Sequence, residues 1–309
     1  MKRFYSNGKL ILTGEYLVLD GAKALAIPTK YGQDLIVEEI TDHQLVWISY
    51  TNNGEIWFEA TFDLPDLKLK TASFVSEIEK SADFIAEILQ NILLEAKKLN
   101  PQFLETATGF KVETNLTFER KWGLGSSSTL INNIANWANV DAYTLLWNAF
   151  SGSGFDIACA QSKSPILYQL EDKKPIIKQV KFKPDFEDSL FFVYLNKKKN
   201  SREGIASYRE NSKDLQHQIE QVSNLSTEFL YAKNIKDFEK LIKEHETIIG
   251  SILKQTPIKQ DLFPDYLGEM KSLGAWGGDF ILATGNEKTP RYFIDKGFNT
   301  VIPYQKMVV

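Results

Sequence analysis

Residues 122–128 read Trp-Gly-Leu-Gly-Ser-Ser-Ser, and this segment decides more of the fold than any other. The alternating residues 110–118 before it predict a strand with one buried face, and residues 126–137 after it carry apolar side chains at helical spacing. The two glycines permit a tight turn, and the serines fall in the first helical turn, where unpaired N–H groups attract anions. The segment predicts a phosphate-binding loop, with a plain serine cap as the alternative.

This segment matches neither of two familiar nucleotide-binding motifs. No lysine follows its second glycine, as a Walker-type loop requires, and its glycine spacing differs from that of a dinucleotide fingerprint.

Three further segments combine glycine with a residue suited to catalysis. Residues 152–156 read Gly-Ser-Gly-Phe-Asp, and an acid at such a turn orients a nucleophile, takes its proton or helps to hold a metal, unless it only caps a helix. Residues 274–279 read Gly-Ala-Trp-Gly-Gly-Asp and predict either a loop that lets the backbone approach a ligand or a bulge before a strand. Lys9 follows Gly8, and its point charge would counter the charge on a transferred phosphoryl group unless it is simply solvated.

Hydrophobic periodicity predicts a mixed chain of two halves, and we expect domains at 1–162 and 163–309. No repeat and no flexible linker interrupts it. Strands are predicted at 10–12, 16–19, 45–50, 55–62, 110–118, 165–170, 176–182, 190–195, 280–284 and 291–294, helices at 74–93, 126–137, 141–150 and 219–253, and hairpin turns at 20–21 and 52–54.

The composition is that of an ordinary globular protein. Of 309 residues, 43% are apolar and 25% are charged, and 36 basic against 40 acidic residues give a net charge of −4, which excludes a disordered chain and gives no overall attraction to nucleic acid or a membrane surface. Cys159 is the only cysteine, so no intrachain disulfide forms and a reducing compartment fits best. Since the apolar N-terminal runs are too short for a signal sequence and the helical stretch 82–96 is broken by polar residues, we expect a cytoplasmic protein.

The remaining candidate residues give weaker indications. His43, His217 and His245 lack metal-ligand spacing, and we expect His217 and His245 at the surface because they fall in charge-rich helical stretches. Cys159 is expected to be packed rather than reactive.

In this order, residues 8–16, 123–128, 152–156 and 274–278 resemble the motifs of the GHMP kinase superfamily, and the isoprenoid branch fits best. That branch is similar in its aspartate turn and in its glycine-rich ending, where Trp276 replaces a glycine here. The resemblance implies an α+β fold of two domains, an N-terminal ribosomal-S5-like domain and a C-terminal ferredoxin-like α/β sandwich. It also implies that ATP and Mg²⁺ are the cofactors.

Site residues follow from the resemblance by position. Asp156 and Lys9 would be catalytic, and Ser127 would bind Mg²⁺. ATP would be bound by Gly123, Leu124, Gly125, Ser126, Ser127, Ser128 and Lys121, and the acceptor by Glu15, Tyr16, Gly154, Lys197, Ser201, Arg202, Gly274, Ala275, Gly277 and Gly278.

The chain also departs from the family pattern. Residues 119–121, Glu-Arg-Lys, replace the usual proline before the phosphate loop, and Ser128 replaces an alanine. Several relatives place a Mg²⁺-binding glutamate where this chain has Leu145, so another acid such as Glu15 or Asp156 would have to complete the metal shell.

Charge near the expected site bears on the choice of acceptor. A phosphate monoester is mostly ionised at pH 7, so it needs less base and more positive charge than an alcohol. Three lysines at 197–199 precede Ser201 and Arg202 in a region where related kinases contact their acceptor, although a solvated loop would look the same. We expect transfer from ATP to phosphomevalonate by a monomer or homodimer. Mevalonate kinase, diphosphomevalonate decarboxylase, a sugar or homoserine kinase, and a non-catalytic ligand-binding protein remain alternatives.

Overall fold

The computed structural model describes residues 1–74, 82–198, 201–211 and 214–309, which form two compact units interleaved in sequence. Two long strands, β1 (Lys2–Ile11) and β2 (Ala24–Ile40), each run from one unit into the other. Unit 1 comprises Met1–Gly8, Tyr31–Arg120 and Leu124–Gln161, and unit 2 comprises Lys9–Lys30, Lys121–Gly123 and Ser162–Val309.

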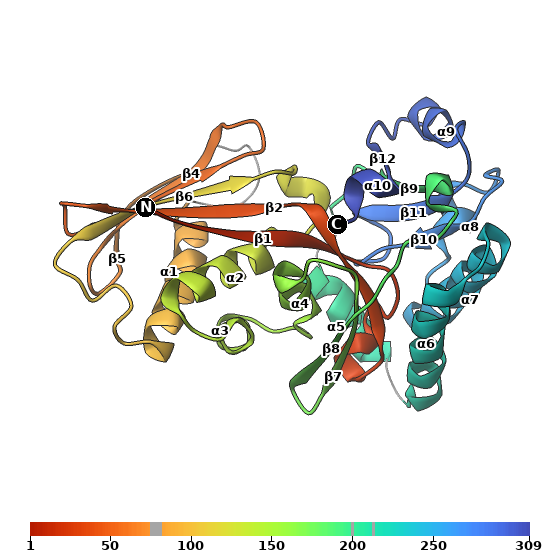
Figure 1. Ribbon diagram of the computed structural model, residues 1–309, viewed down its shortest axis with the longest axis horizontal. Helices are drawn as coiled ribbons and strands as arrows, with labels where there is room; N and C mark the ends of the chain where they lie inside the picture. The colour runs from red at the N-terminus through yellow and green to blue at the C-terminus, as the bar shows by residue number, and fades with distance from the viewer. Residues whose placement is uncertain (75–81, 199–200, 212–213) are drawn as a thin grey trace. The chain divides into compact units, whose positions relative to one another are not determined.

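Unit 1 is built on a mixed sheet (Figure 1). Strand β6 (Gly109–Leu116) pairs antiparallel with β2 and parallel with β3 (Gln44–Tyr50), and β4 (Ile56–Asp63) and β5 (Lys68–Phe74) extend the sheet by antiparallel pairing. Alternate residues of β3 are buried, as the sequence pattern predicts, and the hairpin predicted at residues 52–54 joins β3 to β4.

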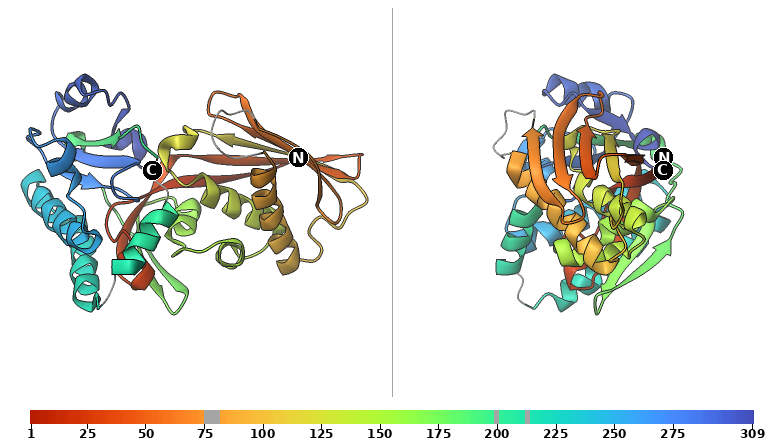
Figure 2. Two further views of the ribbon diagram at one scale, coloured as in Figure 1. Left: turned by 180° about the vertical axis from the view of Figure 1, so that it is seen from behind. Right: turned by 90° about the vertical axis from the view of Figure 1, so that its left-hand side faces the viewer.

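Four helices lie on one face of this sheet, as the views in Figures 1 and 2 agree. They are α1 (Ala82–Leu99), α2 (Ser126–Ala138), α3 (Ala142–Ala149) and α4 (Phe155–Gln161), and α2 packs against each of the other three. One continuous apolar core lies between helices and strands, including Trp47, Phe58, Leu93, Ile134 and Leu145.

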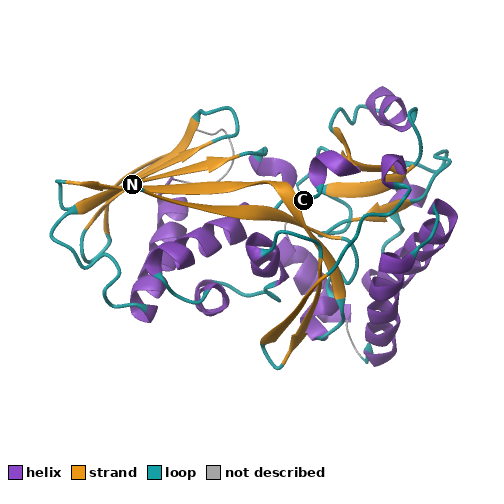
Figure 3. Cartoon of the chain, in the orientation of Figure 1, coloured by secondary structure: helices purple, strands orange, loops and turns teal. Residues whose placement is uncertain are grey.

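Unit 2 has a four-stranded antiparallel sheet and a hairpin that belongs to the eight-stranded sheet containing β2 (Figure 3). The sheet order is β10 (Met270–Ser272), β11 (Phe280–Thr284), β9 (Leu190–Tyr194), β12 (Val301–Pro303). The hairpin of β7 (Ile166–Glu171) and β8 (Lys174–Gln179) pairs with residues 24–26 of β2.

The helices are α5 (Ser201–Asn211), α6 (Gln216–Glu228), α7 (Ile235–Leu253), α8 (Ile258–Leu262), α9 (Thr289–Asp295) and α10 (Tyr304–Met307), with short 3₁₀ turns at Leu17–Asp20, Arg120–Trp122, Glu187–Ser189 and Phe229–Tyr231. None of the helices in the described ranges is both long and apolar enough to cross a membrane.

Three sequence predictions at the start of the chain are wrong. Residues 17–20 form a 3₁₀ turn rather than a strand, and Gly21 caps that turn with a φ of 90° instead of forming a hairpin. Phe74 ends strand β5 rather than starting a helix, and Ile78 lies outside the described residues. These short apolar runs fit either type of element, so their periodicity alone does not decide.

Two predictions in the second half are also wrong. The helix expected at 219–253 is two helices, because a 3₁₀ turn ends the first and Asn234 caps the second by accepting from the Asp237 N–H at 3.0 Å. The strand expected at 291–294 is helix α9, which has Pro290 in its first turn and an ion pair between Arg291 and Asp295.

A buried polar layer fixes helix α2 to the strands of unit 1. Asn133 accepts from the Ser6 hydroxyl at 2.7 Å and donates to the Gln33 carbonyl at 2.9 Å. Asn132 donates to the same hydroxyl at 2.8 Å, and Thr129 donates to the Gln33 side chain at 2.7 Å. All five side chains are nearly inaccessible to solvent. Because buried polar groups need their partners, this layer allows one axial position of the helix.

Replacing Asn133 by alanine tests the polar layer. The change removes both bonds and leaves the Ser6 hydroxyl and the Gln33 carbonyl with one partner fewer, so we expect a loss of about 2–3 kcal/mol in the free energy of unfolding by urea titration. Asn136→Ala, at an exposed position of the same helix, is the control and should change stability by no more than about 0.5 kcal/mol. Equal losses in both variants would contradict the role of the layer.

Candidate functional site

The start of helix α2 has the geometry of an anion-binding helix end. Gly125 caps it in the left-handed conformation, with a φ of 87°. Ser128 is buried and donates its hydroxyl back to the Gly125 carbonyl at 2.9 Å, whereas Ser126 is half-buried and Ser127 is exposed. The side chains at 126 and 127 therefore stay accessible beside the free N–H groups of the first turn, which favour a negatively charged ligand.

Gly123, two residues earlier, belongs to unit 2 and contacts residues of two other glycine-containing motifs. The Lys9 ammonium group donates to the Gly123 carbonyl at 3.0 Å. A Cβ atom on Gly123, whose φ is 68°, would lie 2.5 Å from the carboxyl carbon of Asp279. A residue with a Cβ would be strained at this backbone angle and would require the Asp279 carboxylate to shift. Lys121, whose carbonyl accepts from the Tyr194 hydroxyl at 3.0 Å, is exposed beside it.

The glycine-rich loop that ends at Asp279 is attached to two other predicted site segments. Its Trp276 N–H donates to the Tyr16 hydroxyl at 3.2 Å, which joins it to the first motif. The Asp279 N–H donates to the Lys197 carbonyl at 2.7 Å, which joins it to the basic segment after β9. Positive φ angles at Gly274, Gly277 and Asp279 bend the loop between these attachments, while Ala275 and Gly278 are buried.

The aspartate turn lies in unit 1, at the start of α4. The Trp147 indole donates to the Gly152 carbonyl at 3.2 Å, and Gly154 has a φ of 84°, so the turn is held directly before α4, in which Asp156 is the second residue. The Asp156 side chain is half-buried and accepts from the Ile157 N–H at 3.1 Å. Helices α4 and α2 pack together through Gln161 and Asn132 at 2.9 Å, so both predicted catalytic helix starts belong to one unit.

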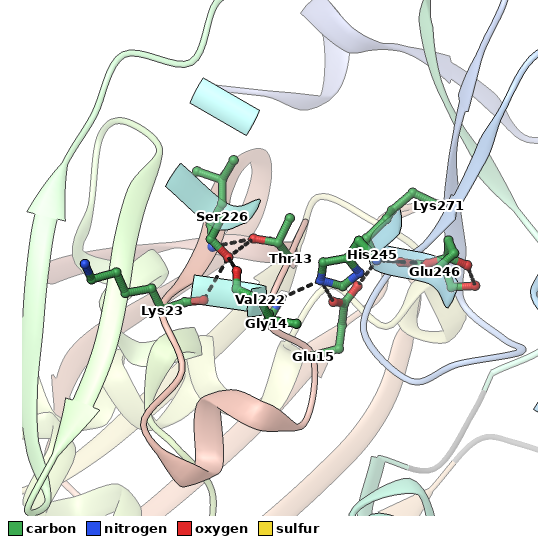
Figure 4. A network of polar contacts seen from close by, with 11 residues as sticks. Thr13, Gly14, Glu15, Lys23, Val222, Ser226, His245, Glu246 and Lys271 are labelled. Carbon is green, nitrogen blue, oxygen red and sulfur yellow. Dashed lines mark hydrogen bonds and ion pairs between the residues drawn. The ribbon is translucent and has the colours of Figure 1, made fainter. Parts of the chain in front are cut away.

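Glu15 has surroundings that its predicted role does not explain (Figure 4). It is 2% exposed, and its Oε1 lies 2.5 Å from the Lys271 ammonium group. Lys271 is fully buried and also donates to Glu246 at 3.1 Å and to the Ser272 carbonyl at 2.8 Å. The Ser272 hydroxyl completes the cluster by donating to Glu246 at 3.0 Å. A carboxylate enclosed in this way is not available to a soluble substrate or a metal ion, so its surroundings do not support Glu15 in either role.

His245 is the residue of this region that the sequence analysis misplaces. It is fully buried, and its Nε2 accepts from the Gly14 N–H at 3.1 Å. Its position follows from the apolar stripe of α7, since Phe238, Ile242, His245 and Ile249 recur at helical spacing. This helical spacing of apolar residues is the sequence pattern that indicates a buried His245. By contrast, the exposed His217 and the buried Cys159 confirm their predictions.

The protonation of the cluster follows from its geometry. His245 Nε2 accepts a hydrogen bond, so the ring is neutral, and burial followed by the charge of Lys271 lowers its pKa well below the usual value. Glu15 Oε2 lies 3.4 Å from the same nitrogen, and among the described residues it has no hydrogen-bond partner. Burial, opposed by Lys271, raises the pKa of Glu15 to about 7. Burial also raises the pKa of Glu246, and the two carboxylates outweigh burial in raising the pKa of Lys271.

Among its described residues, the structure offers only two of the ligands expected for a metal ion, Ser127 and Asp156. Within the ranges that the structure describes, no three acidic, histidine or cysteine side chains gather in a way that would hold a metal ion. Leu145 is fully buried in the core of unit 1. Ser127 and Asp156 therefore remain the candidate ligands of this unit. The side chains of Ser201 and Arg202, predicted to bind the acceptor, lie outside the described residues.

Comparison with known proteins confirms the expected fold. No protein-family model and no curated protein sequence matches this chain. The structure of the Streptococcus pneumoniae phosphomevalonate kinase covers 97% of this chain and 98% of its own, with a TM-score of 0.68 at 17% identity. The Methanococcus jannaschii mevalonate kinase covers 96% and 94% (TM-score 0.64, 17% identity), and the Lactococcus lactis galactokinase, complexed with galactose, covers 94% and 87% (TM-score 0.64, 15% identity). The chain thus has the two-domain α+β fold of the GHMP kinases, and at these identities the likeness concerns the fold alone.

Substituting Gly123 by alanine tests the close contact with Asp279. We expect a loss of stability well above that of Gly297→Ala, in the same unit, which has a φ of 87° but open space around its Cα. The control carries only the strain of a left-handed alanine, about 1–2 kcal/mol, whereas Gly123→Ala must also displace the carboxylate. Thermal or urea unfolding of both variants measures the difference, and similar losses would show that the contact does not constrain the loop.

The pKa of Glu15 predicts a pH-dependent stability. Between the unfolded value of 4.5 and the folded value of about 7, the folded chain keeps a proton that the unfolded chain has lost. The contribution of Glu15 is therefore complete below pH 4.5 and is lost as pH rises through 7. Glu15→Gln removes this titration, so we expect the stability of the variant relative to the parent to increase from pH 5 to pH 7.5, by on the order of 2 kcal/mol.

Urea titrations of both proteins across that pH range measure this effect. His245 titrates in the opposite direction, because its lowered pKa costs stability as pH falls below 6.5. Since this contribution is present in both proteins, the comparison removes most of it. A difference in stability that does not change with pH would contradict the elevated pKa.

Proposed function

We propose that this chain is an ATP-dependent kinase that transfers the γ-phosphoryl group of ATP to phosphomevalonate. The observation that carries the proposal is the bond from Lys9 to the carbonyl of Gly123, against which Asp279 also packs. Residues of three separate motifs thus contact one another at Gly123. The glycine-capped start of α2, which begins three residues later, supplies the free N–H groups that phosphates require.

Catalysis would consist mainly of positioning and charge neutralisation, as is general for phosphoryl transfer. An acceptor oxygen forms a bond to the γ-phosphorus while the bond to the β,γ-bridging oxygen breaks, which yields the phosphorylated acceptor and ADP. Lys9 would neutralise charge on the transferred group, and the amides of the α2 start would hold the phosphates. Asp156 would orient the acceptor and take a proton where the acceptor still carries one.

Mg²⁺ would be held by the exposed Ser127 hydroxyl, with Asp156 as the carboxylate in the same unit. A hard cation suits these oxygen donors, and the phosphates of ATP would supply further ligands. When bound, the ion offsets negative charge on the nucleotide.

Two observations support a phosphorylated acceptor. Lys197 and Lys198 are exposed after β9, and the backbone of Lys197 is bonded to the loop that contacts Gly123. Positive charge at this segment suits an acceptor that is already anionic. In addition, the Streptococcus pneumoniae phosphomevalonate kinase, which shares the fold, has been solved with phosphomevalonate and AMPPNP.

A coupled ADP-release assay with phosphomevalonate, mevalonate, homoserine and galactose tests the proposal. We expect the highest kcat/KM with phosphomevalonate and no release of CO₂. Faster turnover of mevalonate would correct the acceptor, and CO₂ release with diphosphomevalonate would indicate the decarboxylase instead. Binding of Mg-ATP with no turnover of any of these compounds would favour a non-catalytic ligand-binding protein.

Two substitutions test the site residues. Asp156→Asn and Lys9→Met should each lower kcat by about 10²–10³-fold, because each removes a charge expected to act on the reacting groups, while the unfolding midpoint changes little. Asp185→Asn and Lys181→Met, at exposed positions, are the matched controls and should retain parental turnover. Near-parental kcat in both site variants would remove these assignments.

A further inference from the structure

The buried cluster around Lys271, which Figure 4 shows, lies on a closed series of contacts. That series also contains the Lys9–Gly123 bond. Strand β1 carries Lys9 and is followed by the turn that contains Glu15. Glu15 contacts Lys271 in β10, and β10 leads into the glycine-rich loop. That loop ends at Asp279, whose carboxylate packs on Gly123, and Gly123 accepts from Lys9. Lys9, Glu15, Lys271, Asp279 and Gly123, the residues that make these contacts, all belong to unit 2.

We propose that Glu15 and Lys271 are positioning residues that set where Lys9 and the glycine-rich loop lie relative to Gly123. The pair acts through the two backbone segments that it joins. Its kinetic consequence rests on the proposed function, while its structural consequence does not.

The surroundings of Lys271 explain why the pair can fix these segments. Among the described residues, its ammonium group donates to three acceptors, from the first motif, from α7 and from β10 itself, and the side chain has no exposed surface. A buried ammonium group cannot exchange these acceptors for water, so a shift of either segment would leave a charge unpaired. Few positions of β1 relative to β10 satisfy this requirement.

A second contact restrains the same two segments independently. The Tyr16 hydroxyl accepts from the Trp276 N–H at 3.2 Å, one residue beyond Glu15 and five beyond Lys271. The Tyr16 ring also stacks on Tyr208 of α5, with ring centroids 5.7 Å apart. The first motif therefore contacts the segment 271–276 at two points. A displacement of the turn at Glu15 and Tyr16 should for this reason move the backbone of the loop as well as Lys271.

Hydrogen exchange followed by mass spectrometry tests the structural consequence. In Glu15→Gln, which keeps the shape of the side chain, we expect exchange of the amides at 273–279 to become about tenfold faster or more. Lys259→Met is the matched control, because Lys259 forms a partly buried ion pair with Glu269 at 2.8 Å just before β10. It should leave the amides at 273–279 as they are in the parent.

A milder variant keeps the test informative should Glu15→Gln fail to fold. Ser272→Ala removes only the hydroxyl contact to Glu246, and it should accelerate the same amides by a smaller factor. Unchanged exchange at 273–279 in the variants that fold, or equal acceleration in Lys259→Met, would overturn the proposal.

Steady-state kinetics test the second consequence. In Glu15→Gln we expect kcat to fall about tenfold or more while KM for ATP stays within about threefold, since misplacing Lys9 affects the transfer step more than nucleotide binding. Lys259→Met should retain parental kcat at a temperature where it is folded. A parental kcat in Glu15→Gln, despite faster exchange, would overturn the link to Lys9. A parent without kinase activity would refute the proposed function, and the exchange experiment would still decide the positioning role.

Discussion

A lysine ammonium group without exposed surface has to be neutralised where it lies, and Lys271 imposes this requirement on unit 2. Its two carboxylate partners come from the N-terminal turn and from α7, so segments far apart in the chain are held at one point. Such a cluster is weak evidence for stability as such, because desolvation of the charges offsets much of their attraction. Removing one partner, however, costs about 3–5 kcal/mol, since the others stay buried. What the cluster provides is a defined arrangement of backbone segments.

In unit 1, uncharged polar side chains fix the arrangement of the backbone segments. Helix α2 is held by hydroxyl and amide side chains, Ser6, Gln33, Thr129, Asn132 and Asn133, which form bonds of 2.7–2.9 Å with one another and with the backbone. An apolar interface tolerates small sliding movements, but hydrogen bonds have narrow limits of distance and angle. In each unit, therefore, directional polar contacts fix the segment that bears the predicted phosphate-binding groups.

Local patterns predict the parts of the fold that local physics determines. Helix α2, its glycine start and strands β3, β6, β9 and β11 follow from periodicity and turn residues close in sequence. No pattern predicts the full length of β2, because Lys30, Gly32 and Gln33 interrupt its apolar alternation. The contact of Gly123 with Asp279 likewise has no local signal, and only the order of the motifs suggests that they meet. The burial of Glu15 depends on Lys271, which is separated from it by 256 positions, so the sequence near Glu15 carries no sign of it.

That separation also affects how the chain is made. Because synthesis proceeds from the N-terminus, Glu15 leaves the ribosome 256 residues before its partner Lys271. Until then, the turn at residues 14–16 carries an acidic side chain and a Gly14 N–H whose native partners do not yet exist. Native contacts of such long range form slowly, since the intervening chain must first be ordered. The first motif is therefore completed only after Lys271 has been synthesised, and until then the nascent segment around Glu15 depends on water or on a chaperone to satisfy its polar groups.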